Sequence, residues 1–214
     1  MKPFEKMVGE NGLQNALFPL EDLYVLRYHH KGDDYILDLW GYVNGSHVLK
    51  CPIYAPVDMK CVKVGSLSTN EPTVTWESLD KVNFVDGTID YLTLSLSHDD
   101  NFSEYTVGEV IFQGEVIGHT GKAGDASTDH THLIGGKGKF TKYVATPLGQ
   151  WTLENQYPPD DIFGVNDTIL VRTEDPRYPN ALNWREFIPY VPPEPTEKDD
   201  FIILSLVNAM KWSV

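Results

Sequence analysis

The sequence predicts a mainly β protein built on an antiparallel sheet. Aromatic residues make up 12% of its 214 residues, and the strand-favouring residues Val, Ile, Tyr and Thr recur along the chain. Two tight-turn signals, Asn44-Gly45 and Asp86-Gly87, separate runs of such residues. The chain is long enough for one full domain with a sizeable core, and little helix is expected.

The first predicted strands lie at residues 24–28 and 35–40. Because side chains alternate along a strand, Ile36 and Asp38 share one face of the second strand, and Leu37 lies on the other. A carboxylate on such an apolar strand is costly to bury unless it is paired or bound to a metal. Asp38 is therefore a candidate metal ligand.

Further strands and turns follow in order. The sequence predicts a hairpin over residues 53–64, and then strands at 73–76, 82–85, 89–97 and 168–171. The remaining polar stretches, 65–72, 99–106 and 122–129, are expected to form the walls of a substrate groove. Small residues in the last of these would let the backbone approach a bound peptide.

Two histidines stand one residue apart at His130 and His132, on a segment that is predicted to be extended. Their side chains would project from the same face, so that one imidazole could bind a metal while the other reaches the metal-bound water. With His30 and Asp38, His132 would complete a three-ligand set for tetrahedral zinc whose fourth position stays open. The alternative, for an isolated pair of this kind, is two unconnected surface histidines.

Four segments, taken together, resemble the lysostaphin-type zinc endopeptidases, which cut peptide bonds in bacterial peptidoglycan. The segments are His-Lys-Gly at 30–32 with Tyr-Ile-Leu-Asp-Leu at 35–39, Cys-Pro-Ile-Tyr-Ala-Pro-Val-Asp at 51–58 with 62–65, residues 107–110 with 114–121, and Ser127 to His132. Their order and spacing agree over residues 30–135, about half of the chain.

This resemblance implies a lysostaphin-like peptidase fold, an antiparallel sheet with an open groove that holds one Zn²⁺ per chain. Carried over position by position, the metal ligands are His30, Asp38 and His132, and the catalytic residues are His98 and His130. His29 could replace its neighbour as a ligand if the strand slips by one residue. After His132 the sequence reads Leu-Ile-Gly-Gly, which departs from the usual pattern of the family.

The implied activity is hydrolysis of a stem or crossbridge peptide bond in peptidoglycan. Zinc would lower the pKa of its bound water and polarise the scissile carbonyl, while His130, with His98 nearby, moves the proton. Activity is expected to fall in acid, where the ligands protonate and release the metal. One alternative is a retired peptidase fold that serves in a phage tail or in wall binding. Another, zinc amidase action between sugar and peptide, would require a general-base glutamate, and the sequence shows none near the ligands.

A net charge of −14 argues against nucleic acid or an anionic membrane as a general partner. No membrane span and no signal peptide are predicted, the latter because residues 1–20 lack a basic start followed by an apolar run. The expected setting is a bacteriophage: a virion-associated lysin that contacts other tail proteins, or an endolysin held in the host cytoplasm until release. The expected substrate partner is a peptidoglycan peptide.

The predicted organisation centres on a peptidase domain at 24–150, after a lead-in at 1–23. An extension rich in aromatics and proline at 151–192 is expected to pack on the domain, with a wall-binding or assembly role as the alternative. A charged linker at 193–200 and an apolar segment at 201–214 follow. Two cysteines, Cys51 and Cys61, are expected to be free and buried rather than bonded to each other.

Overall fold

The computed structural model describes residues 11–16, 23–30, 33–43, 46–84, 86–147, 149–163 and 182–183, and of residues 23–30, 33, 34, 42, 43, 160, 182 and 183 it describes the backbone alone. The described part holds one short helix, α1 (Pro159–Phe163), and one 3₁₀ turn, η1 (Phe102–Glu104). The rest of its regular structure is strand. The predicted mainly β fold with little helix is therefore confirmed.

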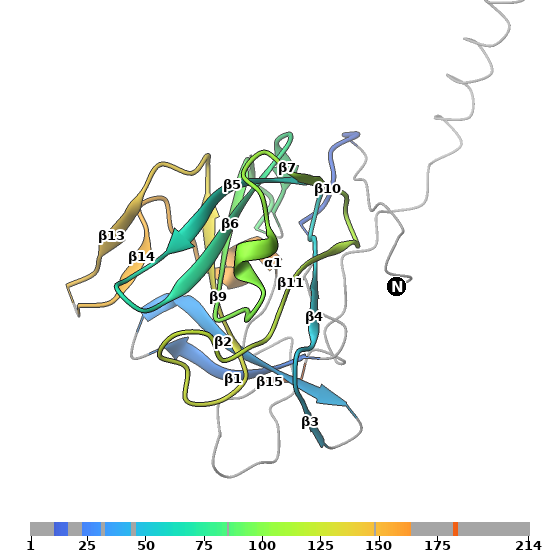
Figure 1. Ribbon diagram of the computed structural model, residues 1–214. Helices are drawn as coiled ribbons and strands as arrows, with labels where there is room; N and C mark the ends of the chain where they lie inside the picture. Colours follow the sequence, from blue (N-terminus) through green and yellow to red (C-terminus); the bar gives the residue numbers. More distant parts are fainter. Residues whose placement is uncertain are drawn as a thin grey trace, which may run out of the picture.

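Nine strands form the main sheet. They are β1 (Leu23–His30), β2 (Asp33–Val43), β3 (Ser46–Val48), β5 (Met59–Ser66), β6 (Pro72–Ser78), β9 (Leu92–Ser97), β10 (Val110–Ile111), β12 (Thr131–Lys137) and β15 (Leu182–Asn183). Every pair is antiparallel, in the order β10-β5-β6-β9-β12-β2-β1-β15, and β3 pairs with β2 (Figure 1). The expected antiparallel sheet is present.

Three two-stranded sheets complete the described strands. They pair β4 (Pro52–Tyr54) with β11 (Val116–His119), β7 (Val82–Asn83) with β8 (Ile89–Asp90), and β13 (Tyr143–Ala145) with β14 (Trp151–Leu153). The predicted turns at 44–45 and 86–87 agree with the pairing, because β2 meets β3 at Val43 and Ser46, and β7 meets β8. The strand predicted at 168–171 and the segments 193–200 and 201–214 lie outside the described residues.

The central strands separate an apolar face from a more polar one. On β2, Leu37 and Leu39 are fully buried in the main core, whereas Ile36 belongs to a second, smaller cluster with Ile134 of β12. The alternation predicted for residues 35–40 is confirmed. Asp38 lies on the same side of β2 as Ile36, away from the main core.

Hydroxyl pairs cover the polar face between β6 and β9. Thr73 Oγ1 lies 2.8 Å from Ser97 Oγ, and Thr75 Oγ1 lies 2.7 Å from Ser95 Oγ. Tyr143, on β13, places its hydroxyl 2.6 Å from Thr75 Oγ1. The β13–β14 pair, at the left of Figure 1, thus packs on the polar face of the sheet. These contacts satisfy hydroxyl groups that would otherwise be buried without a partner.

The prediction of a hairpin over residues 53–64 is wrong. Its first half, β4, pairs with β11, and its second half, β5, pairs with β6 and β10. The reason lies in the connection, where the Ala55 amide donates to the Glu115 carbonyl and the Gly114 amide donates to the Ala55 carbonyl. These bonds hold the chain against 113–115, so the two halves enter different sheets.

The two cysteines follow this division. Cys51 precedes β4 and Cys61 lies within β5, and both are free and buried. Burial raises the pKa of the Cys61 thiol to about 11, which keeps the thiol protonated and unreactive at neutral pH.

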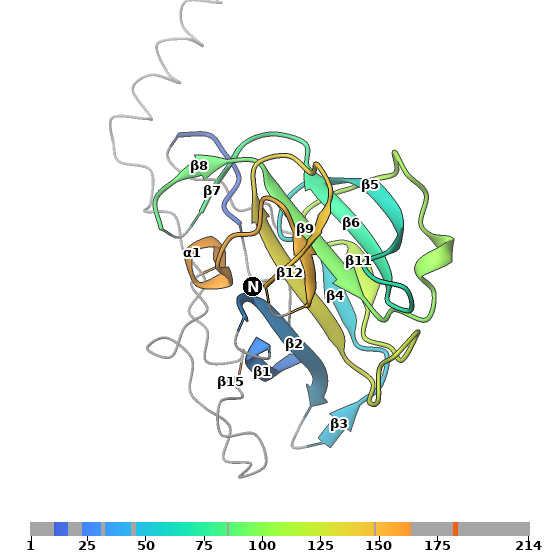
Figure 2. The same cartoon turned by 90° about the vertical axis from the view of Figure 1, so that its left-hand side faces the viewer.

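Helix α1 packs against β12 and β2 (Figure 2). Its Ile162 and Phe163 side chains are fully buried in the main core. Space for this contact comes from Gly135 on β12, where a Cβ atom would collide with Ile162. The Leu-Ile-Gly-Gly departure thus has a packing reason, and the beginning of the predicted extension is part of the core. Within the described residues, no helix has the length and apolarity needed to cross a membrane.

The main chain at His98, directly after β9, takes an unusual conformation. Its φ angle is 75°, in the left-handed region that favours glycine. A non-glycine residue pays about 1–2 kcal/mol there, and such strain often accompanies a functional side chain.

We expect the His98→Gly variant to be about 1 kcal/mol more stable than His98→Ala, because both lose the imidazole but only glycine accepts φ = 75° without strain. Urea unfolding of the two variants measures the difference. His119, on β11, provides the matched control, since alanine should be the more stable replacement at a strand position. An alanine variant at His98 as stable as the glycine variant would contradict the strain assigned here.

Candidate active site

The register of the main sheet brings Asp38 and His132 side by side. Asp38 of β2 is the cross-strand partner of His132 on β12, and His132 is in turn the partner of Ser97 on β9. Cross-strand partners point to the same face with Cβ atoms about 5 Å apart. Accordingly, Asp38 Oδ1 lies 3.0 Å from His132 Nδ1, and both side chains are buried.

Four of the five predicted site residues line a single open pocket of about 460 Å³: Asp38, His98, His130 and His132. His30, the fifth, is the last residue of β1, and its backbone is paired with Asp33. Its side chain, like that of His29, lies outside those that the structure describes. The choice between these two histidines stays a sequence prediction.

Asp38 and His132 fit a shared zinc ion. Two ligands of a tetrahedral zinc stand about 3.3 Å apart, given bond lengths near 2.0–2.1 Å, and the observed 3.0 Å is close to this separation. A carboxylate and an imidazole are also ligands that zinc prefers. Among the side chains that the structure describes, no group of three or more His, Cys, Asp or Glu residues is arranged to hold a metal ion. The fit therefore concerns two ligands, and the third must come from a residue such as His30.

Backbone carbonyls fix the tautomers of the other two histidines. His98 Nδ1 lies 2.9 Å from the Ala123 carbonyl, and His130 Nδ1 lies 2.8 Å from the Thr128 carbonyl. Since a carbonyl only accepts, each Nδ1 carries the hydrogen, and each Nε2 of the neutral ring keeps a free lone pair. The two rings are 4.7 Å apart between centroids. Both can accept a proton within the pocket.

The pKa of His98 lies below its usual value. Burial of the ring is the largest cause, and the neighbouring His130 acts in the same direction, whereas the Ala123 carbonyl and the Glu71 carboxylate oppose the shift. His98 is consequently neutral at neutral pH, the form that accepts a proton.

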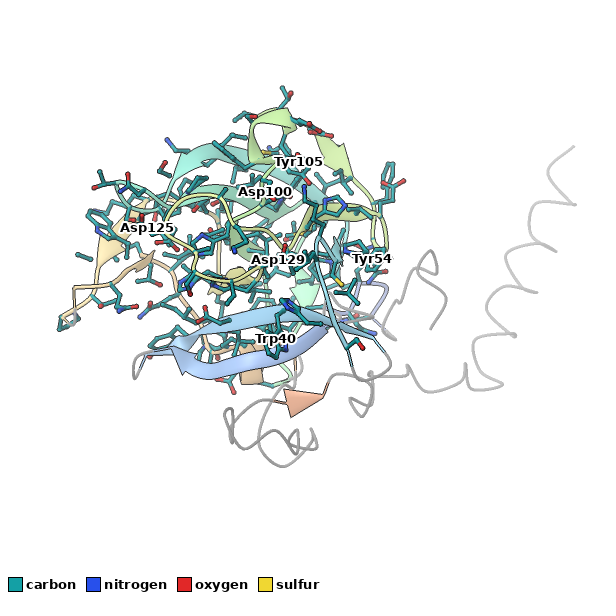
Figure 3. All side chains as sticks on the ribbon, turned by 60° about the horizontal axis from the view of Figure 1, so that its bottom comes forward. Trp40, Tyr54, Asp100, Tyr105, Asp125 and Asp129 are labelled. Carbon is teal, nitrogen blue, oxygen red and sulfur yellow. The ribbon has the colours of Figure 1, made fainter. Side chains whose placement is uncertain are left out.

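Hydrogen bonds of Asp129 hold the segment that carries His130 and His132 in place. Its buried carboxylate accepts a hydrogen bond from the Thr120 hydroxyl, which itself accepts one from the Cys51 amide. Its backbone carbonyl lies 3.3 Å from Nε2 of His47. Figure 3 shows Asp129 between β2 and the loop that follows β9. These contacts tie the start of the His130 segment to the chain before β4.

The pocket walls differ in part from those predicted. Ser68 and residues 125–128 line the pocket, as expected for the stretches 65–72 and 122–129. None of the residues 99–106 does, because that stretch forms η1 and packs toward β5 and β6. In place of residues 99–106, the third wall is formed by Gly149, Gln150 and Trp151 at the β13–β14 connection. The only sequence feature that could have indicated that wall is the aromatic Trp151 between the polar residues Gln150 and Thr152.

A glutamate that the sequence analysis missed also lies in the pocket. Glu71 Oε1 is 3.9 Å from His132 Nε2 and 4.0 Å from His98 Nε2. The expectation that no glutamate stands near the ligands is therefore wrong. Glu71 precedes β6 and is 61 positions from His132 in the sequence, so only the β6-β9-β12 pairing brings them together.

A bacteriophage protein and several distantly related solved structures are similar to this chain. No family model matches the chain. "Morphogenesis protein 1" of Bacillus phage B103 is 35% identical over 172 residues, which cover 76% of this chain. The chain spans only 43% of the length of that relative.

Three similar solved structures are peptidases. An M23 peptidase from Pseudomonas aeruginosa is 20% identical, with a TM-score of 0.38 over 62% of this chain and 50% of its own. A zinc-containing peptidase from Vibrio cholerae is 14% identical, with a TM-score of 0.36 over 61% and 43%. Lysostaphin from Staphylococcus simulans is 15% identical, with a TM-score of 0.40 over 80% and 60%. At these values the likeness is too weak to transfer the activity of those peptidases to this chain.

Proposed function

We propose that the protein is a zinc-dependent endopeptidase that hydrolyses peptide bonds in the stem or crossbridge of bacterial peptidoglycan. One observation carries this proposal: the 3.0 Å contact of Asp38 with His132 lies in a pocket that also holds two histidines whose unprotonated Nε2 atoms can accept a proton. A carboxylate, a ligand imidazole and two proton acceptors are the parts that metal-assisted amide hydrolysis requires.

His30, Asp38 and His132 would hold the zinc ion. When bound, zinc would supply a Lewis acid that polarises the scissile carbonyl and lowers the pKa of the attacking water. Burial of Asp38 and His132 removes competing solvent from the two described ligands. The sheet register holds them at a fixed separation, so little reorganisation is needed on binding.

His130 and His98 would handle the protons. One Nε2 accepts a proton from the attacking water as its oxygen bonds to the carbonyl carbon, and that proton passes to the nitrogen as the C–N bond breaks. The products are a carboxylate and an amine. The small residues at 126–128 in the pocket wall leave room for the substrate backbone.

The phage relative supports a phage setting for this activity. A viral protein that opens the wall would act either from the tail or as an endolysin, with peptidoglycan peptides and other tail proteins as its partners. The name "morphogenesis protein" also favours a second candidate, a retired peptidase fold that serves as a structural or wall-binding tail component. The intact set of Asp38, His98, His130 and His132 speaks for the active enzyme.

Removing the metal should abolish cleavage of purified peptidoglycan, and zinc should restore it. His132→Ala should lose zinc, because it removes a ligand, whereas His98→Ala and His130→Ala should keep zinc and lose about 10²–10⁴-fold in turnover. Turbidity loss of sacculi and metal content by atomic emission measure the two effects. His119→Gln, a histidine outside the pocket, is the control. Equal cleavage by chelated and zinc-restored protein would refute metal dependence, and bound zinc without turnover on any peptidoglycan would favour the structural candidate.

The bond that is cut should be a peptide bond within the peptide part of the wall. Digestion should release new amino termini without new reducing sugars, because amide hydrolysis yields an amine and a carboxylate. Labelling of amino termini and mass spectrometry of the fragments identify the site. Release of whole stem peptides from the sugar would show amidase action, an alternative for which Glu71 could serve as the general base. New reducing ends would show glycosidase action.

A further inference from the structure

Glu71 is held in the pocket by its own backbone. Its carbonyl accepts a hydrogen bond from the Leu67 amide at 2.9 Å and one from the Thr73 hydroxyl at 2.8 Å. Pro72 follows, which restricts the backbone of Glu71 to extended conformations. The side chain is 19% exposed, and Ser68 Oγ lies 3.4 Å from Oε2.

The turn that carries Glu71 is also docked on the opposite loop. The Asp125 amide donates to the Asn70 carbonyl at 3.1 Å, and the His98 amide donates to the Pro72 carbonyl at 3.0 Å. At Gly124, with φ of 75°, a Cβ atom would collide with the Asn70 carbonyl. Both loops therefore fix the backbone from which the Glu71 side chain enters the pocket.

The imidazole of His132 has a carboxylate at each nitrogen. Asp38 Oδ1 lies 3.0 Å from Nδ1, whereas Glu71 Oε1 lies 3.9 Å from Nε2. The two ring nitrogens point away from each other, so a single ion bound at one nitrogen cannot also be shared with the carboxylate at the other. Asp38 is the nearer group and the cross-strand partner, so a zinc ion held by both residues would be bound through Nδ1 of His132.

The geometry points to Glu71 as the positioning residue that accepts the Nε2–H of His132 and so presents the unprotonated Nδ1 to zinc. A histidine ligand usually donates its second N–H to a carboxylate or a carbonyl, which fixes the tautomer and the ring orientation. The separation of 3.9 Å is longer than a hydrogen bond, and a rotation of the Glu71 side chain or one bridging water spans it. This inference rests on the proposed function, because it assigns a partner to the proposed zinc ligand.

The Glu71 carboxylate also lies near His98, one of the two proposed catalytic histidines. Glu71 Oε1 lies 4.0 Å from His98 Nε2, nearly the same distance as from His132. Since Nδ1 of neutral His98 carries its hydrogen, His98 offers no N–H to Glu71. His132 is thus the ring that Glu71 orients.

Zinc affinity, measured by competition with a chelator of known affinity, tests this role. Glu71→Met, which keeps the length but removes the oxygen acceptor, should weaken zinc binding about 10–100-fold. Glu71→Gln, which keeps an acceptor oxygen, should recover most of that affinity. Glu104→Gln, an exposed carboxylate on η1, is the matched control and should not change it.

Three outcomes would overturn the inference. Unchanged zinc affinity in Glu71→Met would remove the positioning role while leaving the proposed function in place. A loss in Glu71→Met and Glu71→Gln as complete as in His132→Ala would make Glu71 a ligand itself. Wild-type protein that binds no zinc would overturn the proposed function and this inference together.

Discussion

The candidate site depends on the register of β2 against β12. A shift of one residue would exchange the two faces of β2, placing Asp38 in the main core and Leu37 in the pocket. That exchange would lower the stability of the fold for two reasons, because it buries a carboxylate among apolar side chains and exposes a leucine. Core packing of Leu37 and Leu39 on one face, and of Ile36 with Ile134 on the other, therefore sets the 3.0 Å contact between Asp38 and His132.

Loops around Asp38 and His132 supply the other polar side chains of the pocket, and backbone hydrogen bonds hold each of these loops in place. The left-handed turn at His98, the carbonyl of Ala123 and the turn before Glu71 are bonded to one another through Pro72 and Asn70. Thr120 and Asp129 do the same for the His130 segment. A site of this construction keeps its polar groups oriented before any ligand arrives, which limits the reorganisation needed for catalysis.

The sequence predicted the features that local patterns carry. Alternation placed Asp38 opposite Leu37, and the spacing of His130 and His132 put both in one pocket. It did not predict the pairing of β4 with β11, the wall at 149–151, or Glu71 beside His132. All three depend on contacts between distant segments, which leave no period in the sequence. The hairpin expected at 53–64 failed for the same reason, since bonds to residues 113–115 decided its path.

A metal located by diffraction tests the central claim most directly. Crystals grown with zinc chloride and measured above and below the zinc absorption edge should show one anomalous peak. The account predicts that this peak lies about 2.0–2.2 Å from Asp38 Oδ1 and from His132 Nδ1, with an imidazole from the His30 region completing the set. A peak on the Nε2 side of His132, between Glu71 and His98, or no peak within the pocket, would contradict it.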